Sequence, residues 1–292
     1  MILVTGATGQ FGTNAIDHLL KKGANPADIS ALVRNTAKAQ PLKEKGIGLR
    51  VGDYTDHDSL VKAFQGVDKL LLVSSNDRQA VENRTAQHIA AIKAAKEAGI
   101  KHIVYTSFVR KPGYENSAIA AFQNSHLQSE AFLKDSGITY TILQNGIYLE
   151  MIPIFAGQKV TESGVILFPA GEGKASYVLR EELAEAASYV LSTEGHENKT
   201  YPLTNIESVS FGGVAHALSA TLGKTVTYQS PPVPEFEATM KQFGVPDLYT
   251  SMFIMWAEAL KQSTMDLQDS SLQSFLGRKP ITVNQFISQV YG

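Results

Sequence analysis

The chain opens with Met1-Ile2-Leu3-Val4-Thr5-Gly6-Ala7-Thr8-Gly9-Gln10-Phe11-Gly12, a short apolar run that leads directly into spaced glycines. The apolar run predicts a buried strand, and the amphipathic stretch that follows the glycines predicts a helix. Glycines at this spacing in a strand-to-helix turn are typical of a loop that binds the pyrophosphate of a dinucleotide. We therefore expect these residues to form a dinucleotide site.

Each of the three glycines has a separate physical role in this interpretation. Gly6 allows the tight turn, Gly9 lacks the Cβ that would block the pyrophosphate, and Gly12 lets the helix pack closely on the strand. The phosphates would lie at the N-terminus of the helix, where N–H groups and the helix dipole favour negative charge. A glycine-rich turn without a ligand is the alternative explanation.

The composition is that of a folded protein without a strongly charged partner. Of the 292 residues, 43% are hydrophobic and 18% are charged, and the net charge of −2 gives no footprint for nucleic acid or an anionic membrane. The absence of cysteine excludes disulfides, thiolate nucleophiles and Cys-ligated metals, and it suits a reducing cytoplasm. Neither a signal peptide nor a bilayer-spanning stretch is recognisable, so we expect a soluble cytoplasmic protein.

Apolar runs and amphipathic stretches alternate through the first half of the chain, as in βαβ units around a parallel sheet. The predicted fold class is α/β, a Rossmann doubly wound parallel sheet with a smaller C-terminal substrate lobe. We expect residues 1–147 to form the dinucleotide-binding domain and residues 148–292 to form the lobe, with some elements of the lobe returning to the sheet. The predicted strands are 2–5, 29–33, 49–52, 69–74, 103–106 and 140–143, and the predicted helices are 10–22, 58–64, 82–98 and 125–135.

The end of the second predicted strand distinguishes NAD from NADP, because an NAD site places an Asp or Glu there on the ribose 2′-hydroxyl. Residues 29–33 are followed by Arg34-Asn35, so the acid is absent and a base is present. A guanidinium can hold a 2′-phosphate through two parallel hydrogen bonds. Arg34 therefore predicts NADPH, and a solvated surface arginine is the alternative.

Polar residues also follow the third and fourth predicted strands, at the sheet edge where ligands bind. Asp53 is placed to meet the adenine end of the cofactor, although an Asp that starts a helix explains the residue almost as well. Ser74-Ser75-Asn76 should run beside the middle of the cofactor. A polar connecting loop is the alternative for that triplet.

Several segments form a combination found in one protein family: residues 5–12, Leu32-Val33-Arg34-Asn35, Gly52-Asp53-Tyr54, Tyr105-Thr106-Ser107 and Gln144-Asn145-Gly146-Ile147-Tyr148. Together they resemble the NmrA-like group of atypical short-chain dehydrogenases/reductases, and within it the branch of type 2 quinone oxidoreductases and triphenylmethane reductases. The resemblance extends over nearly the whole chain, including residues 194–201 and 276–278. It implies an enzyme of the NAD(P)H:quinone oxidoreductase type.

The resemblance also implies NADPH as the cofactor, held by the glycine loop, the arginine after the second strand and the loop after the fourth. Asn145 would lie near the nicotinamide. The family usually has an arginine immediately before that asparagine, where this chain has Gln144, so a charged contact there is not carried over. The full predicted set of cofactor-binding residues is Gly6, Ala7, Thr8, Gly9, Gln10, Phe11, Arg34, Asp53, Ser74, Ser75, Asn76, Thr106, Tyr140, Thr141, Leu143 and Asn145.

Most short-chain dehydrogenases use a Tyr-x-x-x-Lys pair, in which the lysine lowers the pKa of the tyrosine that exchanges a proton with the substrate. This chain has His126-Leu127-Gln128-Ser129-Glu130 on the corresponding helix. Spacing of four residues places His126 and Glu130 on one helical face, so Glu130 could orient the imidazole and raise its pKa for general-acid catalysis. An ordinary surface pair is the alternative, and no third ligand suggests a metal site.

Without the Tyr–Lys pair, the chemistry favours an acceptor that needs little acid catalysis. A quinone takes up hydride to give a delocalised phenolate, and a triarylmethyl cation needs no proton at all. Such a small aromatic acceptor would bind in an apolar pocket, with core packing as the default for each aromatic side chain. The candidates for its lining are Phe108, Tyr148, Met151, Phe155, Phe253, Met255 and Trp256. The resemblance places Tyr148 by the cofactor, so its expected role is substrate positioning.

The sequence thus predicts an NADPH-dependent reductase of a quinone or similar acceptor, with no nucleic-acid, membrane or metal partner. The principal alternative is a dinucleotide-binding redox sensor without turnover, and a second is a reductase of triarylmethane-type or other conjugated compounds. A homodimer is an assembly that the sequence leaves open.

Overall fold

The computed structural model of the chain describes residues 1–75 and 78–292. These residues form two units. Unit 1 comprises Met1–Phe108, Asn124–Asn145 and Arg180–Pro202, and unit 2 comprises Val109–Gln123, Gly146–Leu179 and Leu203–Gly292. Segments that follow residue 148 therefore belong to both units.

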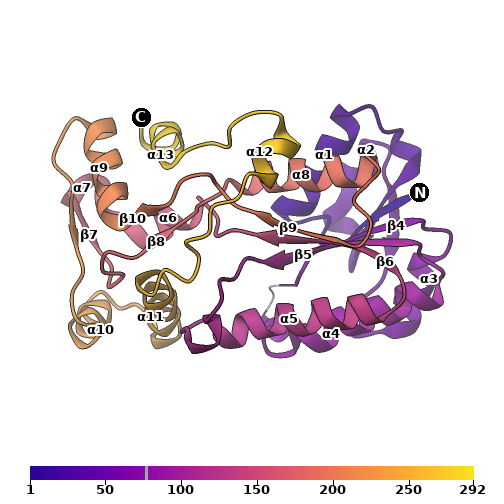
Figure 1. The fold of residues 1–292 in the computed structure, drawn as a ribbon, viewed down its shortest axis with the longest axis horizontal. Coiled ribbons are helices and arrows are strands. Elements are labelled where there is room, and N and C mark those ends of the chain that lie inside the picture. Colours follow the sequence, from indigo (N-terminus) through magenta and orange to yellow (C-terminus); the bar gives the residue numbers. More distant parts are fainter. Residues whose placement is uncertain (76–77) are drawn as a thin grey trace. The chain divides into compact units, whose positions relative to one another are not determined.

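Unit 1 is built on a seven-stranded sheet with the order β3-β2-β1-β4-β5-β6-β9 (Figure 1). The pairings among the first six strands are all parallel. Successive strands are added outward from β1 in both directions, so the chain reverses its direction of winding between β1 and β4, where doubly wound sheets bind ligands. The strands are β1 (Ile2–Val4), β2 (Ile29–Val33), β3 (Gly48–Val51), β4 (Lys69–Leu72), β5 (His102–Phe108), β6 (Thr139–Asn145) and β9 (Lys199–Leu203).

Helices cover both faces of this sheet (Figure 1). One face carries α1 (Gln10–Lys21), α2 (Gln40–Glu44) and α8 (Arg180–Ser192), and the other carries α3 (His57–Phe64), α4 (Arg78–Glu97) and α5 (Ala120–Asp135). Short 3-10 turns lie at η1 (Pro26–Asp28), η2 (Thr36–Ala39) and η3 (Tyr114–Asn116). The predicted α/β fold class is confirmed.

The core of unit 1 consists of aliphatic side chains between the sheet and its helices. On the face of α4 and α5, Leu70, Ile103 and Ile142 are completely buried against Ile92 and Leu133. All five residues of β2 are buried, as expected for a strand of a parallel sheet with helices on both faces. The carboxyl ends of the strands are thereby held in fixed register.

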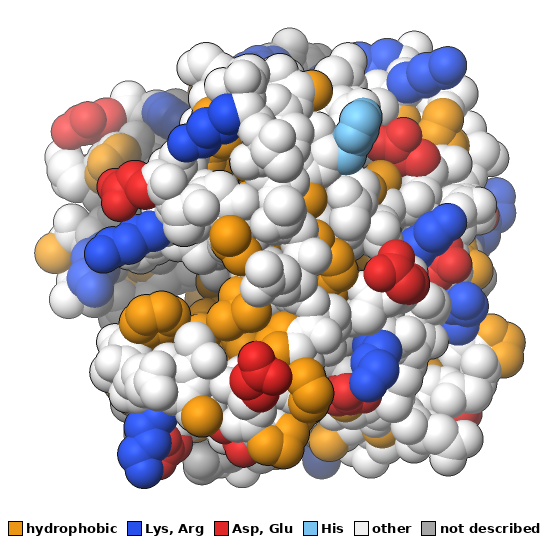
Figure 2. All heavy atoms as spheres, turned by 90° about the vertical axis from the view of Figure 1, so that its left-hand side faces the viewer, with side chains coloured by type: hydrophobic (Ala, Val, Ile, Leu, Met, Phe, Trp, Pro, Cys, Tyr) orange, Lys and Arg blue, Asp and Glu red, His pale blue; other side chains and the backbone are white. Residues whose placement is uncertain are grey.

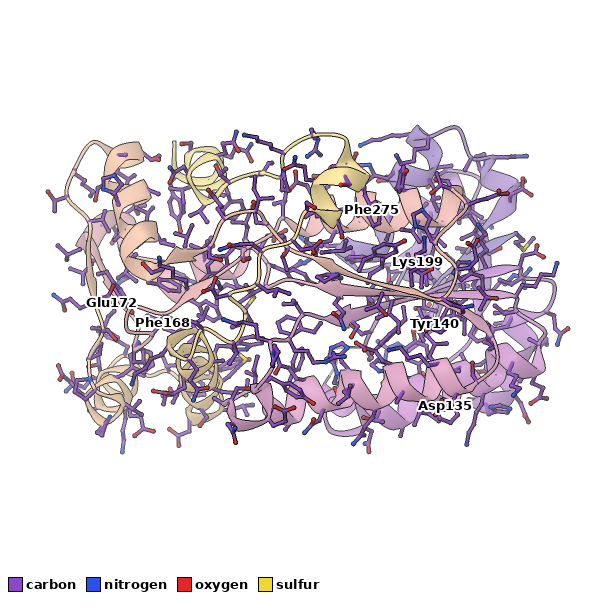
Figure 3. All side chains as sticks on the ribbon, viewed as in Figure 1. Asp135, Tyr140, Phe168, Glu172, Lys199 and Phe275 are labelled. Atoms are coloured by element: carbon purple, nitrogen blue, oxygen red, sulfur yellow. The ribbon has the colours of Figure 1, made fainter. Side chains whose placement is uncertain are left out.

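Unit 2 contains two small sheets, one of β7 and β11 in parallel and one of β8 and β10 in antiparallel arrangement. Its core is aromatic: the ring of Phe168, which is labelled in Figure 3, stacks on Phe155 with 4.8 Å between centroids, and its centroid lies 4.9 Å from that of Phe211. Phe155 is 3% exposed, so it follows the default of core packing. The elements are α6 (Met151–Ala156), α7 (Val160–Ser163), β7 (Val165–Leu167), β8 (Lys174–Ala175), β10 (Val209–Ser210), α9 (Phe211–Leu222), β11 (Thr227–Gln229), α10 (Val233–Gln242), α11 (Asp247–Lys261), α12 (Ser271–Leu276) and α13 (Val283–Tyr291).

The surface of unit 2 carries exposed apolar side chains around the connection between α10 and α11. Phe243 is 73% exposed, and Leu248 and Tyr249 are also exposed. Figure 2 shows hydrophobic side chains gathered at the level of these two helices. Among the helices that the structure describes, none has the length and apolar character needed to cross a bilayer.

Candidate functional site

The glycine turn between β1 and α1 has the geometry that its sequence predicts. Gly6 adopts φ +58°, and the N–H of Gly9 donates to the carbonyl of Gly6 at 2.9 Å. A Cβ on Gly12 would lie 2.4 Å from the Gly6 oxygen, so only glycine allows this close approach of helix and turn. Thr13 Oγ1 donates to the carbonyl of Ala7 at 2.8 Å and closes the turn.

Gly9 is less tightly enclosed than Gly12. Its backbone is extended, with φ −87° and ψ 163°, and an added Cβ would meet only the Gly6 oxygen, at 3.3 Å. Gly9 is also the N-cap of α1, and no capping side chain bonds the first N–H groups of that helix. Space and unoccupied donors at a helix N-terminus suit a phosphate. Within this turn Ala7 and Phe11 are buried, whereas Thr8 and Gln10 are exposed.

Arg34 and Asp53 lie close together beyond the ends of β2 and β3. The Thr55 hydroxyl and N–H donate to Asp53 Oδ1 at 2.7 and 2.8 Å. These two hydrogen bonds and the positive charge of Arg34 lower the pKa of Asp53. The cap of α3 is Asp56, whose Oδ1 accepts from the N–H of Ser59, so Asp53 is not the residue that starts this helix.

Residues 73–75, which follow β4, are held by side chains from three separate segments of the chain. The N–H of Val73 donates to Thr5 Oγ1, and the N–H of Ser74 donates to Thr106 Oγ1, both at 2.8 Å. The N–H of Ser75 donates to Nε2 of His88 at 3.2 Å. Thr106 therefore contacts this loop. Asn76, the third member of the predicted triplet, lies outside the described residues.

The predicted contacts on β6 are spread along the whole strand. Asn145 is at the carboxyl end and 2% exposed, and its Oδ1 has no hydrogen-bond partner among the described residues. Leu143 is buried nearby, two residues before it. Tyr140 lies toward the amino end of β6, on the same side of the sheet as Asp135 at the end of α5 (Figure 3).

Tyr140 and Thr141 are thus far from the edge where the glycine turn lies. Five residues of strand separate Tyr140 from Asn145, which corresponds to roughly 16 Å. Thr141 Oγ1 donates to the carbonyl of His196 at 2.7 Å and accepts from Nε2 of His102 at 2.8 Å. The structure therefore brings Leu143 and Asn145 to the carboxyl edge, but it does not bring Tyr140 and Thr141 there.

A buried polar cluster lies between β5 and the helices α4 and α5. Nη2 of Arg84 contacts Nε2 of His126 at 2.6 Å, and Nδ1 of His126 contacts the hydroxyl of Tyr105 at 2.9 Å. Nδ1 of His88 contacts Ser129 Oγ at 2.9 Å and the Tyr105 hydroxyl at 3.2 Å. Burial, followed by the charge of Arg84, lowers the pKa of His88 to about 3, and burial raises the pKa of Tyr105.

The described contacts of His126 and of Glu130 are with residues of other elements. Its ring nitrogens contact Arg84 and Tyr105, and the hydrogen bonds described for Glu130 come from Ser107 Oγ and from Nε2 of Gln144. His126 is 1% exposed and Glu130 2% exposed, so the pair is not an ordinary surface pair. The partners of His126 come from α4 and β5, and those of Glu130 come from β5 and β6.

Tyr148 belongs to unit 2 and forms an isolated bridge with Val178. It is half-buried, and the neighbouring N–H of Leu149 donates to the carbonyl of Val178 at 2.8 Å. Its role in substrate positioning stays a proposal.

Sequence reasoning did not find Arg84, His88 and Tyr105. Arg84 and His88 are four residues apart on α4, which places them on one helical face, and Tyr105 points to the same side of the sheet. The spacing of Arg84 and His88 was the only feature of the sequence that pointed to this cluster. It could not identify the partners, because they come from β5 and α5.

The sequence pattern of the NmrA-like family matches residues 1–287. The chain belongs to the NmrA-like family. Quinone oxidoreductase 2 of Escherichia coli (strain K12) is 36% identical to this NmrA-like chain over 291 residues, which cover 100% of the chain and 99% of the relative. The resemblance expected from the sequence is therefore confirmed.

Two solved structures extend this similarity to the fold of the NmrA-like chain. The crystal structure of the E. coli NADPH-dependent quinone oxidoreductase complexed with NADPH has a TM-score of 0.91 and 37% identity, with 100% of both chains covered. The structure of Citrobacter sp. triphenylmethane reductase complexed with NADP(H) has a TM-score of 0.90 and 36% identity, with 99% of both chains covered. The glycine turn lies within the matched region of each.

Proposed function

We propose that this chain is an NADPH-dependent oxidoreductase that transfers hydride to a quinone or a similarly electrophilic aromatic acceptor. The observation that carries the proposal is the open glycine turn at Gly9, in a chain that matches over its full length a reductase crystallised with NADPH. Among the described residues, the only atom near the position of a Cβ on Gly9 is the Gly6 oxygen, which supports a phosphate group on this turn. NADPH is thus the proposed cofactor.

The proposed cofactor contacts lie at the carboxyl edge of the sheet. Residues 6–11 would hold the pyrophosphate on the N-terminus of α1, and Arg34 would bind the 2′-phosphate beside the adenosine end. The loop at Ser74 and Ser75 would line the middle of the cofactor. Asn145 Oδ1 would accept from the carboxamide of the nicotinamide, because a buried oxygen without a partner costs about 1–3 kcal/mol.

The reduced nicotinamide supplies the hydride when it is bound. The residues of the chain have to orient the acceptor and exclude water, because the phenolate formed from a quinone is weakly basic and needs no strong acid beside it. We assign acceptor positioning to Tyr148. We assign to His126 a role through Tyr105 rather than proton donation to the acceptor, because Arg84 already donates to its Nε2.

A screen of electron acceptors with NADPH and with NADH tests this proposal. We expect steady NADPH consumption with small quinones, slower consumption with NADH, and loss of both activities in Gly9→Ala. Triarylmethane dyes and azo compounds belong in the same panel, since they would reveal the alternative conjugated acceptors. Tight NADPH binding without turnover of any acceptor would instead identify a redox sensor.

The assembly is a separate proposal. A homodimer would cover exposed apolar side chains such as Phe243 and Leu248 on unit 2. Sedimentation of the wild-type chain and of Phe243→Ser tests it, because a dimer built on this surface would dissociate in the variant.

A further inference from the structure

The three consecutive amides of the loop after β4 are each held by a side chain, and the last of them has an unusual acceptor. Val73 and Ser74 donate to threonine hydroxyls, whereas Ser75 donates to an imidazole nitrogen, Nε2 of His88. His88 is completely buried. A hydroxyl accepts in any protonation state of the protein, but an imidazole nitrogen accepts only when it carries no proton. The Ser75 contact therefore depends on the tautomer of His88.

Two donors that cannot reverse their roles fix the protons of the whole cluster. The amide of Ser75 always donates, so Nε2 of His88 is unprotonated and its proton is on Nδ1. The guanidinium of Arg84 always donates, so Nε2 of His126 is unprotonated and its proton is also on Nδ1. Both imidazoles are therefore neutral Nδ1–H tautomers.

The remaining hydrogen bonds agree with this assignment. Nδ1–H of His126 donates to the Tyr105 oxygen at 2.9 Å. The Ser129 hydroxyl donates its proton to the carbonyl of Ser125 at 2.7 Å, so Ser129 Oγ can only accept from Nδ1–H of His88. The Tyr105 oxygen, 3.2 Å from Nδ1 of His88, is a second and longer acceptor for the same proton. Contacts at both ring nitrogens therefore assign the same tautomer to His88.

We propose that His88 is a positioning residue for the loop after β4, which it holds through Ser75 as an Nδ1–H tautomer fixed by Ser129. The hydrogen bond from Ser129 on α5 orients the ring, and the ring holds the amide of Ser75. Only the consequence for NADPH rests on the proposed function, because this loop is the proposed lining of the middle of the cofactor. The hydrogen bond from the Ser75 amide to His88, here called the Ser75 anchor, is present without any ligand.

Two substitutions of similar size distinguish the contact at Nε2 of His88 from the contact at Nδ1. In His88→Gln, the side-chain oxygen can reach the position of Nε2 and accept from Ser75. In His88→Asn, the shorter amide reaches only the position of Nδ1, so the contact with Ser129 is kept and the Ser75 amide loses its acceptor. Both variants remove the imidazole and keep a buried amide group, so a general loss of packing affects them alike.

We expect His88→Asn to raise the KM for NADPH about tenfold and to speed hydrogen exchange of the Ser75 amide by a similar factor, with kcat within about twofold of the wild type. His88→Gln should keep both quantities near the wild-type values. His216→Gln, which changes an exposed histidine of unit 2, is the control for removal of an imidazole. Equal behaviour of the Gln and Asn variants in amide exchange would overturn the proposal.

A measurement on the wild-type protein needs no variant to fold. Nitrogen NMR of the labelled protein should show Nε2 of His88 without a proton and a coupling across the hydrogen bond to the Ser75 amide nitrogen. A proton on Nε2 of His88 would contradict the proposal, because that nitrogen could then not accept from the Ser75 amide. If the coupling is present but the protein neither binds NADPH nor turns it over, the proposed function fails and the anchor stands.

Discussion

Arg34 is the residue that separates NADPH from NADH in the proposed site, and Arg34→Ala tests it. Hydrogen bonds to charged groups contribute about 1.5–3 kcal/mol, so NADPH affinity should fall roughly 10- to 100-fold while NADH affinity changes by less than about threefold. Titration of nicotinamide fluorescence with both cofactors measures the two ratios. Lys43→Ala, which removes an exposed charge from α2, is the matched control. Equal losses for both cofactors would refute the 2′-phosphate assignment.

Two glycines of the same turn should respond to alanine in opposite ways. Gly12→Ala places a Cβ 2.4 Å from the Gly6 oxygen, so we expect the free energy of unfolding to fall by about 1–3 kcal/mol or more. Gly9→Ala keeps an allowed backbone, and its contact of 3.3 Å with the Gly6 oxygen needs a shift of only a few tenths of an ångström, so the free energy of unfolding should fall less than in Gly12→Ala. Its methyl group instead occupies the space proposed for the pyrophosphate, and NADPH affinity should fall by more than about tenfold.

Urea denaturation and NADPH titration of both variants check this contrast. If Gly9→Ala binds NADPH as the wild type does, the pyrophosphate does not lie on this turn.

At the scale of elements, β5, β6 and the segment between α8 and β9 are joined at the amino edge of the sheet. His102 on β5 bonds to Thr141 on β6, and Thr141 bonds to the carbonyl of His196. Burial lowers the pKa of His102, nearby Lys69 and His196 lower it further, and Glu197 opposes them. Thr141 thus has a structural role at the edge opposite the glycine turn.

The burial of His102 predicts how the free energy of unfolding depends on pH. The unfolded chain takes up a proton at His102 near pH 6.5, whereas the folded chain does so only at lower pH. The free energy of unfolding should therefore decrease as the pH falls below about 6.5, by up to about 1.4 kcal/mol per pH unit from this group. His102→Gln keeps a partner for Thr141 and does not titrate, so its slope between pH 6.5 and 4.5 should be shallower than that of the wild type.

Urea denaturation at several pH values measures the two slopes, with His216→Gln as the control for an exposed histidine. Parallel slopes for the wild type and His102→Gln would show that this histidine does not contribute.

The sequence predicted the elements of unit 1 well and the contacts between them less well. The predicted strand 29–33 coincides with β2, because a run of buried residues marks a strand with helices on both faces. The glycine turn was readable because its residues are neighbours in the chain. The cluster around Tyr105 was not, because it joins α4, β5 and α5, and one sequence does not show which polar residues of different elements meet.

At the scale of the whole molecule, the two units are interleaved along the chain. The chain passes from one unit to the other after residues 108, 123, 145, 179 and 202. A cut at the predicted boundary, after residue 147, would remove α8 and β9 from unit 1. Leu183, Ala187 and Val190 of α8 are completely buried, and α8 packs on α1. The helix that starts at the glycine turn thus depends on a segment from the second half of the chain.

We therefore expect the fragment 1–147 to lack cooperative unfolding and NADPH binding, because the buried face of α1 would be exposed to water. The matched control adds residues 180–203 to this fragment through a short Gly-Ser linker. A short linker suffices because Tyr148 and Val178 are paired neighbours in unit 2. Thermal melts followed by circular dichroism, with and without NADPH, compare the two chains. The fusion should melt cooperatively and gain stability with NADPH, and a fragment 1–147 that does the same would show that α8 is dispensable for the site.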